Sequence, residues 1–485
     1  MMKKVLILCM LACSLSFGQD KPNIIYILAD DLGYNEVGAY GQEKIKTPNI
    51  DLLAKQGMKF TQHYSGSAVC APSRCVLLTG KHTGQSFIRN NGEFGGGWHR
   101  DDAEGQMPIP DSALTIAEVL QTKGYKTAAV GKWGLGGPSS WGHPNFQGFD
   151  FYYGHLCQRM AHNFYPTHLW KNKRKIHLNN EYFKSHQKFP KDKDPNDPEN
   201  YKGYAGSDYA EDLMAEESLK FIKTNHKKPF FLYYASPVPH VSLQVPEDSL
   251  KEYLGKFDDK PYLGQKAYLP HQHPRAAYAA MVTRFDKHIG QIMDLLKELK
   301  IDDNTIIMFS SDNGPTFNGG SDSKFFNSAG PFDGLKCSLK EGGIRVPMIA
   351  KWPGKIKASS TSAHVSSFDD VFPTICEIIG AEIPKDITGI SFAPELLGKD
   401  AQKTKKVLYW EYGSQQAIRN GDWKLYRRYN KKNDKVTTSL YNLKTDIAEQ
   451  SDLSEKNPEK ISELLKLIKE NRSTSKYFPS AWDKH

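Results

Sequence analysis

The first three-quarters of the chain alternates short β-branched or aromatic runs with longer amphipathic stretches, and this alternation constrains the fold most. Chains patterned in this way fold into α/β domains, in which helices flank a mostly parallel sheet. We therefore expect a large, mostly parallel or mixed central sheet. The predicted strands cover residues 23–28, 126–130, 229–235, 305–309 and 346–350, and the predicted helices cover residues 50–56, 114–123, 275–299 and 370–379.

The pattern changes near residue 400, where strand-like pieces become short and closely spaced. These pieces cover residues 407–411, 416–418, 423–426 and 439–442, and a helix is predicted near residues 459–470. Closely spaced short strands favour a small antiparallel sheet. We expect a main α/β domain over residues 19–399 and a small α+β subdomain over residues 400–485.

The N-terminus has the features of a targeting segment. Lys3 and Lys4 precede an apolar run, and small residues follow it before Gln19, so residues 1–18 are predicted to be a signal peptide. A second interpretation makes Cys13 the acylated residue of a lipoprotein. Later segments are not apolar for long enough to be transmembrane. The mature protein is therefore expected to be secreted or periplasmic.

The net charge indicates an acidic partner. It is +9 for the whole chain and falls to +7 when the charges of Lys3 and Lys4 leave with the signal. A solvated basic surface also explains such a surplus, above all in the polar tract 171–202, which is predicted to be a loop insertion. Nucleic-acid-binding motifs do not accompany the charge. An anionic polysaccharide suits both the charge and the export signal.

The cysteine count is odd once the signal is removed. Seven cysteines are present, and two lie in the signal, which leaves Cys70, Cys75, Cys157, Cys337 and Cys376. An odd number cannot pair completely in an exported chain. The spacing does not suggest zinc. The leftover thiol therefore invites a chemical explanation.

Polar residues fall where the predicted strands end. In open α/β sheets, ligands bind just beyond the carboxyl ends of the strands. Four such clusters are therefore expected to converge on one edge of one sheet. They are Asp30 with Asp31, Lys132, His240, and Asp312 with Asn313.

Residues 70–80 read Cys-Ala-Pro-Ser-Arg-Cys-Val-Leu-Leu-Thr-Gly and resemble the signature of the type I sulfatases in the alkaline phosphatase superfamily. The resemblance implies an alkaline-phosphatase-like fold, and it implies that a maturation enzyme oxidises Cys70 to formylglycine. Pro72 suits the first turn of a helix, which places Cys70 at a helix N-terminus. The alternative is a structural cysteine or a disulfide with Cys75.

In this family the hydrated aldehyde attacks sulfur, and restoring the carbonyl later expels sulfate. The resemblance also implies a Ca²⁺ site, because two of its segments match the metal-binding segments of sulfatases. These contain Asp30, Asp31, Asp312 and Asn313, with Cys70 next to the ion. Calcium takes six to eight oxygen ligands, which this set supplies. Taken singly, each segment could be an ordinary turn. The lack of histidine ligands argues against a zinc phosphatase site.

Four further positions match by motif. The resemblance implies that Lys132 and Lys336 contact sulfate, that His240 contacts the bridging oxygen as a general acid, and that Arg74 holds the formylglycine and metal region together. One position departs from the family, since many sulfatases read Gly-Lys-Trp-His where this chain has Gly134. His143 is a candidate replacement for that base.

Substrate recognition is expected from a less regular segment. Arg159, His162 and Asn163 are candidates for sugar or carboxylate contacts, although this tract could equally serve only to fold the site. The segment resembles bacterial carbohydrate sulfatases of the arylsulfatase A and N-acetylgalactosamine-6-sulfatase group.

These observations predict hydrolysis of O-sulfate esters on a carbohydrate. One alternative keeps the fold and changes the reaction to hydrolysis of a phosphonate or phosphate ester. Another is a non-catalytic binder of sulfated glycans in which Cys70 remains a thiol.

Overall fold

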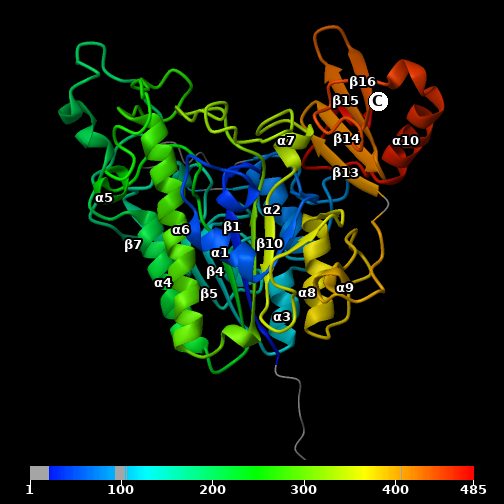
Figure 1. The fold of residues 1–485 in the computed structure, drawn as a ribbon, viewed down its shortest axis with the longest axis horizontal. Helices are drawn as coiled ribbons and strands as arrows, with labels where there is room; N and C mark the ends of the chain where they lie inside the picture. Colours follow the sequence, from blue (N-terminus) through cyan, green and yellow to red (C-terminus); the bar gives the residue numbers. More distant parts are fainter. Residues whose placement is uncertain (1–20, 93–103, 105, 406, 485) are drawn as a thin grey trace, which may run out of the picture.

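The molecule is built around one large mixed β-sheet (Figure 1). The computed structural model describes residues 21–92, 104, 106–405 and 407–484. Within this part of the chain the sheet has ten strands in the order β11-β2-β10-β9-β1-β8-β4-β5-β6-β7. In that order they are Ser360–Ser362, Met58–Phe60, Met348–Lys351, Thr305–Ser311, Asn23–Ala29, Phe230–Ala235, Lys126–Lys132, Phe151–His155, His168–Lys171 and Arg174–His177.

The five central strands, β9, β1, β8, β4 and β5, run parallel to one another. β1 reads Asn-Ile-Ile-Tyr-Ile-Leu-Ala and is buried along its whole length. Such continuous apolar runs are typical of parallel strands, whose two faces are both covered. The predicted parallel core is thus confirmed.

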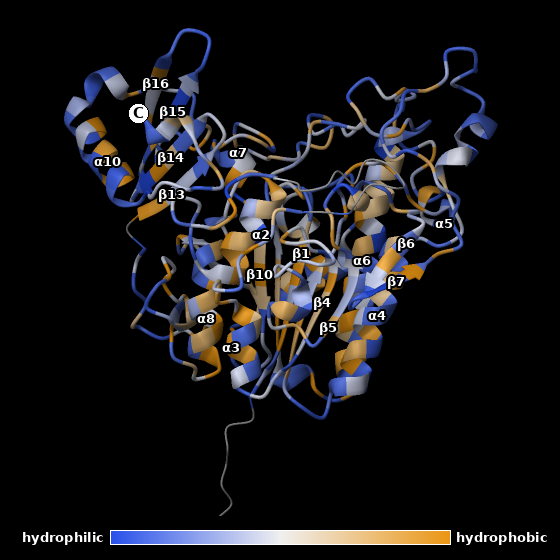
Figure 2. Cartoon of the chain, turned by 180° about the vertical axis from the view of Figure 1, so that it is seen from behind, coloured by the Kyte–Doolittle hydropathy of each residue, from blue (hydrophilic) through white to orange (hydrophobic). Residues whose placement is uncertain are grey.

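Helices cover both faces of the sheet (Figure 1). Successive side chains of a strand point to opposite faces. Ile25 and Ile27 pack with helices α1, α4 and α6, whereas Ile24 and Tyr26 pack with α2, α3 and α8. Figure 2 shows the hydrophobic strands enclosed between these layers. The helices are α1 Pro48–Gln56, α2 Cys70–Thr79, α3 Ile116–Thr122, α4 Ala210–Asn225, α5 Glu247–Leu250, α6 Pro274–Glu298, α7 Glu341–Ile344, α8 Val371–Ile378, α9 Ala393–Leu396 and α10 Pro458–Glu470.

One sequence expectation was wrong in part. The tract 171–202 is not only a loop, because Arg174–His177 forms the edge strand β7 and residues 198–204 form a 3₁₀-helix. Strand β10 matches the predicted strand at 346–350 but runs antiparallel to β9. Strand direction depends on how the chain returns to the sheet, and local sequence does not encode it. The predicted signal peptide and Cys13 lie outside the described residues.

A small antiparallel sheet of four strands, with α10 against it, follows the main sheet as predicted. Its strands are β13 Val407–Tyr412, β14 Gln415–Asn420, β15 Trp423–Asn430 and β16 Lys435–Asn442. This C-terminal sheet lies at the end of the molecule where α2 begins (Figure 1).

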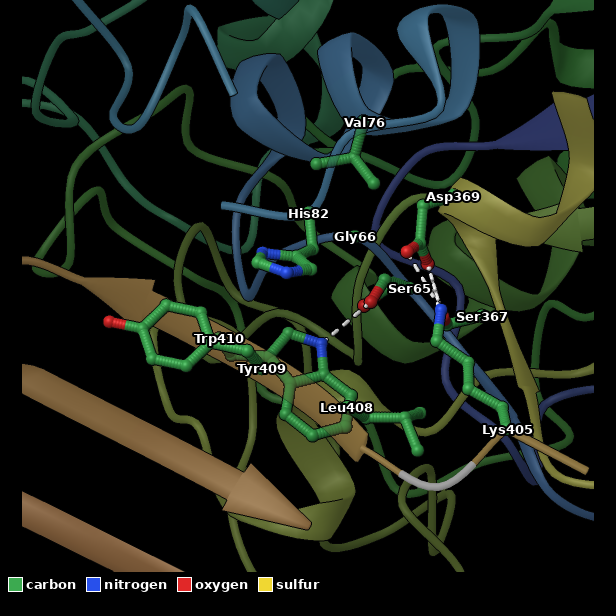
Figure 3. A pocket seen from close by; sticks show the side chains of 10 residues that line it. All are labelled: Ser65, Gly66, Val76, His82, Ser367, Asp369, Lys405, Leu408, Tyr409 and Trp410. Carbon is green, nitrogen blue, oxygen red and sulfur yellow. Dashed lines mark hydrogen bonds and ion pairs between the residues drawn. The ribbon is translucent and has the colours of Figure 1, made fainter. Parts of the chain in front are cut away.

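Buried polar contacts link the C-terminal segment to the α/β domain (Figure 3). Lys405 Nζ lies 2.7 Å from Asp369 Oδ2 and 2.9 Å from Asp370 Oδ1, and Trp410 Nε1 donates to the Ser65 carbonyl at 2.9 Å. Removing one partner of a buried ion pair costs about 3–5 kcal/mol. The cavity between these residues has a volume of about 10 Å³, which is room for at most one water molecule. This cavity is therefore structural.

Two buried histidines near this cavity predict sensitivity to acid. Burial lowers the pKa of His63 to about 3 and of His82 to about 4. The pKa of a histidine in the unfolded chain is about 6.5. Below this pH the unfolded chain binds protons at the two histidines, whereas the folded chain keeps them neutral. The contribution of these two neutral histidines to the free energy of unfolding is complete above pH 6.5. It is lost towards pH 4, by up to about 1.4 kcal/mol per pH unit for each histidine.

We therefore expect the melting temperature to fall between pH 7 and pH 5. In His63→Gln this fall should be smaller, because unfolding should take up about one proton fewer. Thermal unfolding at a series of pH values measures both. His226→Gln, at a partly exposed histidine, is the matched control. An equal slope in His63→Gln and the parent would contradict the assignment.

No helix in the described residues is both long and apolar enough to cross a membrane.

Candidate active site

Helix α2 begins at Cys70, so the thiol lies at a helix N-terminus. The preceding residue is extended and offers no side-chain cap. Instead, Asn91 Oδ1 accepts a hydrogen bond from the Ala71 amide at 3.1 Å. The remaining first-turn amides and the helix dipole favour negative charge at this position.

The ends of four parallel strands meet at Cys70. Asp30 and Asp31 follow β1, Lys132 ends β4, His240 lies beyond β8, and Asp312 follows β9. Cys70 Sγ is 3.3 Å from Asp30 Oδ1. The convergence expected from the strand ends is therefore present.

Three cations, the buried Lys132 and Arg74 and the partly buried Lys336, face three buried carboxylates in this site. Lys132 Nζ lies 2.5 Å from Asp30 Oδ2, and Lys336 Nζ lies 2.7 Å from Asp31 Oδ2. Arg74 Nε and Nη2 donate to Asp312 Oδ2 at 3.0 and 2.8 Å. Formal charges within the set therefore cancel.

Arg74 joins three of the converging segments. Its Nη1 donates to the Lys132 carbonyl at 2.5 Å, and its Nη2 lies 3.3 Å from Asp30 Oδ2. Although burial opposes its charge, Asp312 raises the pKa of Arg74. Arg74 thus remains a fixed cation between β1, β4 and β9.

Burial and neighbouring charges shift the pKa values of Asp30 and Asp312 in opposite directions. Burial alone would raise the pKa of Asp30, but Lys132 and Arg74 hold it below its usual range. Burial and the charge of Asp30 raise the pKa of Asp312 to about 6. For Cys70, burial and the Asp30 carboxylate raise the pKa well above its usual value. The unmodified thiol is therefore a poor source of thiolate at neutral pH.

The residues fit a hard divalent cation. Asp30, Asp31, Cys70 and His240 present ligand atoms that all lie within 4.8 Å of one another. Asn313 Nδ2 donates to Asp31 Oδ1 at 2.7 Å, which leaves Asn313 Oδ1 buried without a hydrogen-bond partner. An orphaned buried oxygen beside carboxylates is the donor type that calcium takes. The proximity of His240 to the Asp30–Asp31 segment agrees with the convergence expected from the strand ends.

His240 is held by its backbone and by stacking. Its Nδ1 faces the Val241 carbonyl at 2.5 Å, and its Nε2 lies 3.6 Å from Asp31 Oδ2. Burial and Lys336 lower the pKa of His240 to about 3, so the ring is neutral at pH 7. In that form Nδ1 donates to the carbonyl, and Nε2 faces the site as an acceptor.

His162, one of the predicted substrate contacts, reaches this site. Its ring stacks on His240 with centroids 4.6 Å apart, and its Nδ1 lies 3.0 Å from His186 Nε2. Tyr268 closes the group, with its ring 5.2 Å from that of His162. Sequence reasoning missed His186 and Tyr268, because both lie in irregular segments without a motif.

The other predicted substrate residues have different surroundings. Arg159 is half-buried and close enough to His186 to lower the pKa of that histidine, after the larger effect of burial. Asn163 Oδ1 accepts from the Tyr165 amide at 2.9 Å, a local turn contact. His143 is buried, with Nδ1 accepting from the Asn145 amide and Nε2 facing the Asn172 carbonyl at 3.3 Å. Both ring nitrogens of His143 thus serve the local backbone, which favours a structural role.

Gly134 has a physical reason to lack a side chain. Its φ of +78° lies in the left-handed region that favours glycine, and an added Cβ would lie 3.0 Å from Gln158 Cγ. A histidine here would be strained and would displace Gln158. The absence of the expected base is therefore built into the local packing.

The predicted disulfide alternative is not formed. Cys70 and Cys75 are not joined to each other by a disulfide bond in the structure. Cys75 lies within α2 and accepts a hydrogen bond from Ser86 Oγ at 3.3 Å.

Comparisons with known proteins agree with this geometry. A family model described as Sulfatase matches residues 22–381, and one described as N-sulphoglucosamine sulphohydrolase, C-terminal, matches residues 330–474. The N-acetylgalactosamine-6-O-sulfatase of Bacteroides thetaiotaomicron is 30% identical over 92% of both chains. Mouse arylsulfatase G is 30% identical over 84% of this chain and 76% of its own.

Solved structures show the same architecture. Ps i-CgsB aligns with a TM-score of 0.75 at 27% identity over 96% of both chains. The phosphonate monoester hydrolase of Agrobacterium radiobacter aligns with a TM-score of 0.64 over 93% of this chain and 96% of its own. Its identity of 17% shows the fold alone.

Proposed function

The chain belongs to the sulfatase family, the sulfuric ester hydrolases, and on that premise we propose that it hydrolyses O-sulfate esters on a carbohydrate and releases inorganic sulfate. The observation that carries the proposal is the meeting of Cys70 with three buried carboxylates and three cations at the N-terminus of α2. The proposal assigns the catalytic role to Cys70, Arg74, Lys132, His240 and Lys336.

The charge of the site suits a sulfate monoester. The three carboxylates and three cations cancel, so a bound divalent cation would leave a surplus of two positive charges. A monoanionic ester is attracted to such a surplus, and the attraction is stronger in a buried site than in water. Charge complementarity therefore supports an anionic substrate.

Asp30, Asp31, Asp312 and Asn313 would hold a calcium ion beside Cys70. The support is the all-oxygen donor set and the unpartnered Asn313 Oδ1. A calcium ion there would supply positive charge that lowers the pKa of the nucleophile and attracts the ester. His240 borders this set and is not counted among the ligands.

Conversion of Cys70 to formylglycine by a maturation enzyme is part of the proposal. A thiol with a raised pKa, 3.3 Å from a carboxylate, is poorly suited to attack an anion. Formylglycine would supply an oxygen nucleophile in place of sulfur. The N-terminus of α2 and Arg74 hold this residue in place.

Lys132 and Lys336 are proposed to bind sulfate oxygens. Each is now paired with a carboxylate, and each ammonium has further N–H donors for an incoming anion. Loss of one such preorganised donor typically costs about 10²- to 10³-fold in rate. His240 is proposed to pass a proton to the departing alkoxide, which contributes roughly 10²- to 10⁴-fold. Because His240 is neutral in the free protein, it must gain that proton when the anionic ester is bound.

Three observations support a carbohydrate as the leaving group. Relatives at 30% identity are named for a sulfated amino sugar. The half-buried His162 stacks on His240, the half-buried Arg159 lies near His186, and both side chains offer polar contacts to a hydroxyl or carboxylate. The N-terminal sequence has the features of an export signal, so we place the enzyme in the periplasm or outside the cell.

A panel of defined substrates tests the proposal. We expect free sulfate from at least one sulfated saccharide drawn from glycosaminoglycans, mucins, carrageenans and ulvans. An aryl sulfate and an aryl phosphonate ester provide the comparison of reaction type. Sulfate release only from the aryl ester would sink the carbohydrate assignment, and faster turnover of the phosphonate would sink the reaction itself.

A further inference from the structure

The segment that carries Lys336 is tied by main-chain hydrogen bonds to both sides of the active site. The Lys336 amide donates to the Pro315 carbonyl at 2.9 Å, two residues after Asn313. The Cys337 amide donates to the Ala68 carbonyl at 2.9 Å, two residues before Cys70. The position of the Lys336 backbone is thus set relative to the metal ligands and the nucleophile.

A third tie comes from the C-terminal sheet. Gln415, the first residue of β14, donates from Nε2 to the Cys337 carbonyl at 2.8 Å. Its Oε1 accepts from the Leu339 amide at 3.1 Å and from the Tyr426 hydroxyl at 2.9 Å. One amide side chain therefore bridges the Cys337 carbonyl and the Leu339 amide, and Tyr426 holds that amide in orientation.

The backbone at this point needs such support. Cys337 has a φ of +70°, a conformation that residues with a side chain rarely adopt. It persists only where the surroundings over-determine it. Gln415 binds the carbonyl of Cys337 and the amide two positions later, so it supports the backbone at its strained position.

We propose that Gln415 is a positioning residue for Lys336, through which the C-terminal sheet holds the sulfate-binding ammonium in place. The inference rests on the proposed function, because it takes Lys336 to bind the sulfate group. Gln415 acts through the loop at residues 336–339, and Lys336 itself reaches Asp31. The C-terminal sheet is in this way part of the anion site.

The test variant is Gln415→Leu, which keeps the approximate side-chain size and removes both hydrogen bonds to the loop. Displacement of a reacting or binding group by about 1 Å can cost about 10²-fold. We expect kcat/KM for a sulfate ester to fall about 10- to 100-fold, and inhibition by free sulfate to weaken. Hydrogen–deuterium exchange of the peptide containing Leu339 should become faster.

Gln416→Leu is the matched control. Gln416 is the adjacent, buried glutamine of the same strand, and its amide bonds Tyr409 and Arg427 within the C-terminal sheet. It should lose stability without a change in kcat/KM or in Leu339 exchange. Melting temperatures of both variants verify that each protein is folded.

A double-mutant comparison with Lys336→Ala separates the two claims. If Gln415 acts through Lys336, Gln415→Leu should have little further effect once Lys336 is alanine. A full additional loss in that background, or normal kcat/KM in Gln415→Leu despite faster Leu339 exchange, would overturn the inference and leave the proposed function intact. Full activity of Lys336→Ala would overturn the sulfate-binding role of Lys336 itself.

Discussion

Replacement of Cys70 by alanine is expected to abolish sulfate-ester turnover, with a fall of roughly 10⁴- to 10⁶-fold in kcat, the scale on which enzymes lose rate when the nucleophile is removed. The reason is positional. Cys70 lies at the N-terminus of α2, where the strand ends converge, and its thiol contacts Asp30. Free-sulfate release from the best saccharide of the substrate panel measures the effect.

Cys75→Ala is the matched control for this prediction. Cys75 is a second buried cysteine of the same helix, and its sulfur contacts Ser86 rather than the charged cluster. It should cost stability and leave turnover in place. Intact-mass analysis of the parent should show the mass deficit of an aldehyde, which peptide mapping assigns to residue 70. A Cys70→Ala protein that matches the parent in turnover would refute the nucleophile, and an unmodified thiol in active parent enzyme would refute the maturation.

Removal of calcium is expected to stop turnover and to lower the melting temperature. A ligand present at 100 times its dissociation constant stabilises the folded state by about 2.7 kcal/mol. Without the ion, Asn313 Oδ1 has no hydrogen-bond partner, and the carboxylates of Asp30, Asp31 and Asp312 keep only their lysine and arginine partners. Chelation followed by calcium titration, with both turnover and thermal unfolding recorded, measures the effect.

Asn313→Ala should weaken the calcium-dependent rise in melting temperature, because it removes one neutral oxygen donor and leaves the charge unchanged. Asn145 provides the control, since its Oδ1 is also buried without a partner, but it lies within the 3₁₀-helix Pro144–Phe146 and its Nδ2 donates to Phe149 and Asn172. Asn145→Ala should keep the full calcium response. An equal calcium midpoint in Asn313→Ala and the parent, or undiminished turnover after chelation, would exclude the proposed site.

Much of the fold could be predicted because it depends on local patterns. The apolar run of β1, the amphipathic run of α6 and the change of pattern near residue 400 all produced the expected elements. Edge strand β7 was missed because its residues are mostly exposed and carry no apolar pattern. Direction in β10 was not predictable from local residues either.

The residues of the candidate site, too, could be predicted only where a local pattern marks them. Cys70, Lys132 and Asp312 could be identified because each stands in a motif or directly after a strand. His186 and Tyr268 stand in irregular segments and reach the site only through the path of long loops. The local role of His143 could not be foreseen, since it depends on contacts with Asn145 and Asn172.

By itself, the sequence determined the class of fold, the motif residues of the site and the family to which the chain belongs. Hydrophobic patterning and motif spacing are local properties, and they are present in the chain before it folds. Only the tertiary structure decided which charges pair, that Gly134 leaves room for Gln158, and that Gln415 supports the segment of Lys336. These contacts join residues far apart in the chain, and their distances depend on how ten strands and their connecting loops pack together.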